Sequence, residues 1–97
     1  MATFIVLGSF TDQGIRNIKD SPKRVEAFKA QAKKMGITVK DMYWTLGHYD
    51  LVVTLEAPDA ATITASSLAT GALGNVRTET LTAFGYDEFS KILAKLG

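Results

Sequence analysis

The sequence has no cysteine among its 97 residues, which excludes a disulfide framework, a thiolate nucleophile and a thiolate metal site. It also lacks any apolar run near the ~18–20 residues that a membrane-spanning helix needs. Neither sign of charge dominates, because 11 Lys and Arg oppose 10 Asp and Glu for a net charge of +1. A chain without a strong overall field does not gather phosphates or anionic lipid. These absences predict a protein that binds neither a membrane nor a nucleic acid.

No charged segment, apolar run and small-residue cleavage site open the sequence, so we do not expect a secreted protein. Together with the lack of cysteine, this leads us to expect a cytoplasmic protein. Basic residues cluster between positions 16 and 34, and such a cluster is usually the solvated face of a helix rather than a nucleic-acid site. Hydrophobic residues make up 46% of the sequence, which is enough to build a folded core.

Two segments are apolar on both of their alternating faces, as strands covered on both sides of a sheet are. In residues 3–10, Phe4 and Val6 share one face while Ile5 and Leu7 share the other. Residues 49–57 repeat the pattern, with Leu51, Val53 and Leu55 on one face and Val52 on the other. Both segments are therefore predicted to be central strands.

Two further strands are predicted at residues 37–46 and 76–84. The apolar phase of the first shifts near Lys40 and Asp41, which indicates a bulge. The second alternates cleanly and is rich in threonine, with Arg77 and Glu79 on one face.

A tight turn is predicted between the second and third strands. Gly47 stands first in a two-residue connection, at residues 47–48, as a type II′ hairpin turn requires. This turn would pair Leu46 with Tyr49 and Trp44 with Leu51.

Helices are expected at about 11–19, 22–35, 59–72 and from about 87. Ser21 and Asp59 are the expected N-caps of the second and third. Helical spacing predicts the buried stripes, which are Val25, Phe28, Ala32 and Met35, then Ala61, Ala65, Leu68 and Ala72, then Phe89, Ile92, Leu93 and Leu96.

The element order is therefore βαββαβ with an extra C-terminal helix, which predicts an α+β, ferredoxin-like sandwich forming one domain over residues 1–97. Right-handed crossovers place the first and third strands centrally and both crossover helices on one face of the sheet. The other face stays open in a monomer although both central strands are apolar on that side. We therefore expect the chain to bind itself, as a homodimer or a higher homo-oligomer.

Four blocks of sequence resemble, in order, the GYD-domain family of small bacterial and archaeal proteins. They are Thr11-Asp12-Gln13-Gly14-Ile15, Tyr43-Trp44-Thr45-Leu46-Gly47-His48-Tyr49-Asp50, Glu56-Ala57-Pro58-Asp59 and Leu73-Gly74-Asn75-Val76-Arg77-Thr78. The resemblance covers nearly the whole chain and implies a ferredoxin-like domain of the dimeric α/β-barrel superfamily. It implies no established activity, because that architecture includes monooxygenases, isomerases, haem-binding enzymes and ligand-sensing domains.

His48 is the only histidine and so the first candidate for a general base or a metal ligand. It sits at a hairpin tip, where a polar residue needs no function. A metal site would have to combine His48 with carboxylates such as Asp50 and Glu79, and one histidine without cysteine argues against it. We expect no metal and no cofactor, and the absence of Ser–His–Asp, P-loop and Rossmann patterns leaves catalytic residues unassigned.

A small-molecule ligand could bind around the hairpin and the neighbouring strand faces. The candidate residues are Trp44, His48, Tyr49, Asp50, Arg77 and Glu79. Aromatic residues can close the end of a barrel, and an arginine beside carboxylates can hold an anionic substrate. Packing of the hairpin, acceptance of turn N–H groups by Asp50 and ion pairing along the sheet are the structural alternatives.

Three functions remain open at this point. The first is a non-catalytic homo-oligomer that binds a small molecule or a partner protein. The second is a small cofactor-independent enzyme, similar to a monooxygenase or an isomerase, with its site in the barrel. The third is a building block of a larger assembly.

Overall fold

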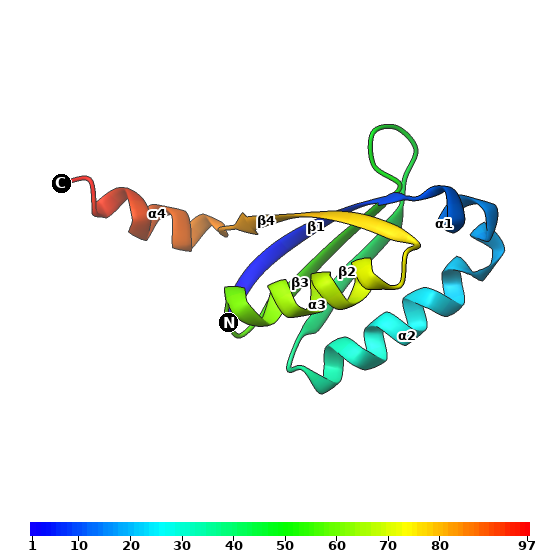
Figure 1. The fold of residues 1–97 in the computed structure, drawn as a ribbon. Coiled ribbons are helices and arrows are strands. Elements are labelled where there is room, and N and C mark those ends of the chain that lie inside the picture. Colours follow the sequence, from blue (N-terminus) through cyan, green and yellow to red (C-terminus); the bar gives the residue numbers. More distant parts are fainter.

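The computed structural model describes residues 1–97 and confirms an α+β, ferredoxin-like fold (Figure 1). The elements are β1 (Ala2–Phe10), α1 (Asp12–Arg16), a 3-10 turn η1 (Ile18–Asp20), α2 (Ser21–Lys34), β2 (Thr38–Trp44), β3 (Leu51–Ala57), α3 (Ala60–Ala72), β4 (Val76–Ala83) and α4 (Tyr86–Ala94). None of the helices combines the length and apolar character that crossing a bilayer would require.

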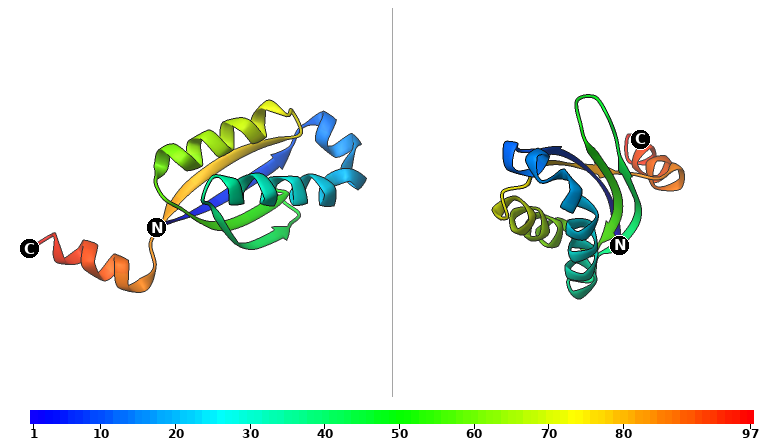
Figure 2. Two further views of the ribbon diagram at one scale, coloured as in Figure 1. Left: turned by 90° about the horizontal axis from the view of Figure 1, so that it is seen from below. Right: turned by 90° about the vertical axis from the view of Figure 1, so that its right-hand side faces the viewer.

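The four strands form one antiparallel sheet in the order β2-β3-β1-β4, so the expected central strands, β1 and β3, are confirmed. Helices α2 and α3 both lie on one face of the sheet (Figure 2). The core lies between the sheet and these helices and consists of Phe4, Val6, Ala32, Ile37, Val53, Leu55, Ala57 and Ile63. Val25 is also buried and Phe28 and Met35 pack against the core, which confirms the stripe expected for α2.

The opposite face of the sheet is not covered by any element of the chain (Figure 1). Ile5 and Leu7 of β1 and Val52 of β3 are half-buried on this face. Tyr43 of β2 and Leu81 of β4 flank them and are more exposed. The register puts them together, because Ile5 pairs with Leu81 and Val52 with Tyr43. We call this surface the open face.

The bulge predicted in the second strand is confirmed, but the two-residue turn after it is wrong. Trp44 pairs with Leu51 as expected, yet both strands end at this pair and a loop spans residues 45–50. The Thr45 hydroxyl donates to the Tyr49 carbonyl at 2.6 Å, which takes this carbonyl away from the strand ladder. The Thr45 N–H donates to the Asp50 carbonyl at 2.8 Å and closes the wider loop.

Ser21 does not cap α2, contrary to expectation. It is the first residue of the helix, and η1 leads directly into it without any side-chain cap. Its hydroxyl is buried and accepts a hydrogen bond from the Trp44 indole N–H at 3.0 Å. The serine therefore joins α2 to the end of β2.

Helix α3 is capped by Asp59 as predicted, since this carboxylate accepts the Thr62 N–H at 2.8 Å. The predicted buried stripe, Ala61, Ala65, Leu68 and Ala72, is wrong, because Ile63 and Ser66 are the buried residues and Leu68 is 69% exposed. Small side chains surround this helix on every side and favour no face strongly. The single isoleucine therefore decides which face meets the sheet.

Helix α4 forms in the predicted segment, but its stripe is not buried within the chain. Strand β4 is paired with β1 along its whole length, and the chain that follows it carries α4 away from the body of the molecule (Figure 1). None of its residues is buried, and Phe89 and Leu93 are each about half exposed.

Candidate functional site

Three of the four sequence blocks that resemble the family meet at one end of the sheet, where β1 ends. The fourth, residues 56–59, lies at the other end, beside the start of β1. Asp50 forms the first link where β1 ends, because its carboxylate accepts the Phe10 N–H at 2.9 Å. Its own N–H donates to the Gly8 carbonyl at 2.8 Å. Asp50 thus accepts the N–H of a strand rather than of its own turn, and it fixes the loop 45–50 against β1.

The start of α1 and the loop between α3 and β4 form the second link. Thr11 uses its N–H for the Asn75 carbonyl at 3.1 Å and its hydroxyl for the Gly74 carbonyl at 2.6 Å. The Gln13 amide donates to the Asn75 side chain at 2.9 Å. Gly14 allows this approach, since a Cβ atom there would lie 2.0 Å from the Asn75 carbonyl oxygen.

Arg24 of α2 also contacts α1 at this end of the sheet. Its guanidinium donates to the carbonyl oxygens of Asn17 at 3.0 Å and Gly14 at 3.2 Å. It also lies 6.0 Å from the centre of the Phe10 ring, within cation–π range. Its charge and donors are therefore used to hold α1 between β1 and α2.

Tyr49 and Glu79 are the two candidate residues that the fold brings into contact. The Tyr49 hydroxyl donates to the Glu79 carboxylate at 2.5 Å. This hydrogen bond, with repulsion between the carboxylate and a phenolate, raises the pKa of Tyr49 above 10.0. The pair is exposed and joins the loop 45–50 to β4.

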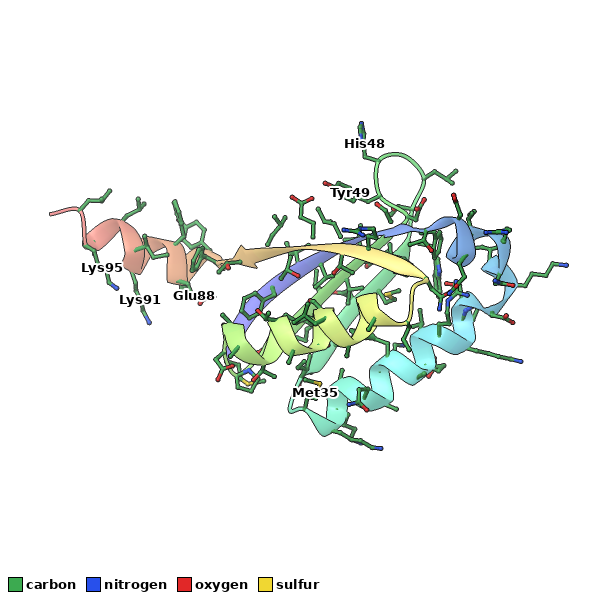
Figure 3. All side chains as sticks on the ribbon, viewed as in Figure 1. Met35, His48, Tyr49, Glu88, Lys91 and Lys95 are labelled. Atoms are coloured by element: carbon green, nitrogen blue, oxygen red, sulfur yellow. The ribbon has the colours of Figure 1, made fainter.

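The other candidates are spread over the two sides of the sheet. Arg77 pairs with Ser9 and lies on the open face, two residues from Glu79. Trp44 lies on the helix side, where it bonds Ser21, so it does not share a pocket with Arg77. His48 points outward from the loop, away from the body (Figure 3). No three His, Cys, Asp or Glu side chains come together as metal ligands would.

A groove that sequence reasoning missed runs between α2 and α3, on the helix side of the sheet, with a volume of about 470 Å³. Its floor consists of core residues of β1 and β3, including Val6, Val53 and Leu55. Its edges carry small side chains, among them Ala27 of α2 and Ala69 of α3. Small residues at helical spacing on both crossover helices were the available signal, because they leave the space between the helices unfilled.

Comparison with known proteins identifies a family and a relative. The family model described as "GYD domain" matches residues 4–93. The "Glutamine synthetase and cystathionine beta-lyase binding protein" of Thermus thermophilus is 38% identical over 84 residues, which cover 86% of this chain and 88% of the relative. No solved structure matches the chain at a significant level.

Proposed function

The chain belongs to the GYD-domain family, and from this membership we propose that it is a non-catalytic homo-oligomer that binds a partner enzyme. The relative of Thermus thermophilus carries the proposal, because it aligns with most of this chain and is named for binding two enzymes. We propose the same class of partner here, glutamine synthetase or cystathionine beta-lyase of the same host. Residues 1–97 would act as one domain.

The hydrogen bonds of the candidate residues support binding over catalysis. Asp50, Tyr49 and Glu79 use polar atoms for links within the chain. A general base or nucleophile needs instead to face a substrate. The surfaces available to other molecules are apolar and lie on the open face and along α4.

Helix α4 supports self-association. It has nine residues, fewer than the ~12–15 below which an isolated helix is marginal in water. Glu88, Lys91 and Lys95 point toward the side of the molecule on which α2 and α3 lie (Figure 3). At 100° per residue, Phe89 and Leu93 lie on the opposite side of α4, the side of the open face. One partner could therefore cover both surfaces.

The exposed apolar side chains supply much of the area that a stable dimer buries. Tyr43, Phe84, Tyr86 and Phe89 are 58%, 53%, 88% and 51% exposed. Taking ~200 Å² for each aromatic side chain, they expose roughly 500 Å² together. The leucines of α4 and the central strands of the open face add to this, toward the ~800 Å² per partner of a standard interface.

Purified enzymes test the partner directly. Immobilised wild-type chain is exposed to glutamine synthetase and to cystathionine beta-lyase of its host, with serum albumin as the control. We expect saturable binding of at least one enzyme. Absence of binding to both enzymes at micromolar concentrations would contradict the proposed function.

Sedimentation velocity tests self-association. We expect wild type to sediment as a dimer or larger and Leu93→Asp to sediment as a monomer, because a carboxylate in an apolar interface is strongly unfavourable. Lys91→Asp places the same group on the other side of α4 and should leave the assembly intact. A monomeric wild type would refute the oligomer.

A further inference from the structure

The groove between α2 and α3 has the dimensions of a short protein segment. It extends from Ser21 to Gln31 along α2 and from Ile63 to Leu73 along α3, about ten residues or ~15 Å along each helix. The two helices run beside each other over the sheet (Figure 2). The residues that line the groove come from both of them. An occupant about ten residues long, if helical, would span it.

The interior of the groove favours apolar contact over recognition of a polar small molecule. Every fully buried side-chain nitrogen and oxygen in the structure has a hydrogen-bond partner, and the other polar groups that line the groove, such as the Ser66 and Thr70 hydroxyls, are uncharged. Arg24, the charged residue that lines the groove, already donates to two carbonyl groups. The floor offers Val6, Val53 and Leu55.

The two sides of the groove differ strongly in charge. Helix α2 carries five basic residues and one acidic residue, whereas α3 carries no charged residue at all. Helical geometry places Lys23 and Lys34 next to Ala27, on the outer side of the α2 edge. Neither lysine forms a salt bridge, since the basic residues that do are Lys29 and Lys40. The groove is thus an apolar channel with a positive border.

We infer that this groove binds a segment of the partner protein whose apolar side chains enter the channel and whose carboxylates face Lys23 and Lys34. The inference rests on the proposed function and adds the location and the chemistry of the contact. Placing an amphipathic helix in an apolar groove is a common mode of peptide recognition, and charge complementarity sets its specificity. The open face and α4 then serve copies of the chain, and the groove serves the partner.

Two designed amphipathic peptides of about ten residues test the inference without the partner enzyme. They share their leucines and differ in carrying glutamate or lysine on the polar face, and each is labelled with fluorescein for anisotropy. The key variant is Ala27→Glu, which places a carboxylate at the edge of the groove. Ala61→Glu is the matched control, because Ala61 is exposed at the start of α3, does not line the groove and receives the same charge away from Lys23 and Lys34. Circular dichroism confirms that both variants fold.

We expect the acidic peptide to bind wild type at least tenfold more tightly than the basic one. Ala27→Glu should weaken its binding at least tenfold, and Ala61→Glu less than threefold. Equal binding of both peptides, or equal binding by Ala27→Glu and wild type, would overturn the inference. A third outcome would also overturn it: neither peptide binds, but wild type binds the uncharged dye 1-aminoanthracene and Ala27→Glu does not. The groove would then be a small-molecule site.

The same variants separate this inference from the proposed function. If an enzyme partner binds wild type and Ala27→Glu equally, the groove is not the contact, although the chain still binds enzymes. If neither enzyme binds but the acidic peptide keeps its preference and its dependence on Ala27, the groove is supported and the proposed enzyme partners are wrong.

Discussion

Replacing Gly14 by alanine should destabilise the fold, although alanine is the better helix former. Gly14 lies within α1, where the exchange alone would stabilise the helix by about 1 kcal/mol. The new Cβ would lie 2.0 Å from the Asn75 carbonyl oxygen and 2.9 Å from its carbon. These are backbone atoms that cannot rotate away, so α1 and the loop before β4 must separate.

The cost follows from the bonds that this separation breaks. Thr11 donates twice to the loop, to Asn75 and Gly74, and Gln13 donates to Asn75 and Leu73. Four hydrogen bonds at a net ~1 kcal/mol each exceed the helix gain, which leaves a loss of about 3 kcal/mol. For a domain of this size the melting temperature should fall by roughly 12–24 °C.

Urea denaturation at one fixed protein concentration measures this loss, since association contributes to apparent stability. Gly71→Ala is the control, because Gly71 lies near the end of α3, has no positive φ and leaves open space where an alanine methyl group would lie. It should raise the unfolding free energy by about 0.5–1 kcal/mol. A Gly14→Ala protein as stable as wild type would refute the steric reasoning.

Substitutions at three further positions test the links at the sheet end and at α3. Asp50→Ala should lower the unfolding free energy by about 1–3 kcal/mol in urea, while Asp50→Asn, which keeps an acceptor, should cost less; equal losses would contradict the role of that acceptor. Tyr49 should ionise above pH 10.0 in absorbance titrations, because its pKa is raised by the hydrogen bond to Glu79. This bond should stabilise the fold at pH values below the pKa of Tyr49 in the unfolded chain, and the stabilisation should be lost as pH rises through the pKa in the folded chain. Glu79→Gln should return the pKa of Tyr49 toward 10.0, and an unchanged titration would exclude the pairing in solution. The hydrogen bond from the Thr62 N–H lowers the pKa of Asp59 below 3.8. The Asp59 cap should therefore stabilise the fold at pH values above the pKa of Asp59 in the unfolded chain, and this stabilisation should be lost as pH falls through the pKa in the folded chain. Asp59→Asn should remove this pH dependence from acid unfolding curves, and an unchanged dependence would contradict the role of the cap.

The strands and their order could be predicted because apolar residues on both faces mark central strands directly. On an edge strand with one face exposed to solvent, the residues of that face would be polar. The apolar residues Ile5 and Val52 therefore indicate central strands. The loop 45–50 could not be predicted, because it is set by contacts of Asp50 and Tyr49 with β1 and β4 rather than by the turn preference of Gly47. Local preference is weak beside several tertiary hydrogen bonds.

The candidate residues could be chosen from the sequence, but the contacts among them could not. Tyr49 and Glu79 are both recognisable as candidates, but their contact joins residues 30 apart and depends on the register of β4. The groove depends on the rotation of α3, which the sequence leaves nearly undetermined because small residues lie all around it. The stripe of α4 is recognisably apolar, but the sequence does not show whether the surface that buries it belongs to the same chain or to another.

The bulge between Val39 and Asp41 has a consequence for how copies of the chain can associate. Strand β2 is an edge of the sheet, and a regular edge offers unpaired N–H and C=O groups to any strand that approaches. The bulge breaks that row, and Lys40, paired with Glu56 at 3.1 Å, adds charge to it. This edge is therefore protected against strand-by-strand growth of the kind that leads to aggregation, and association is directed to the faces of the molecule.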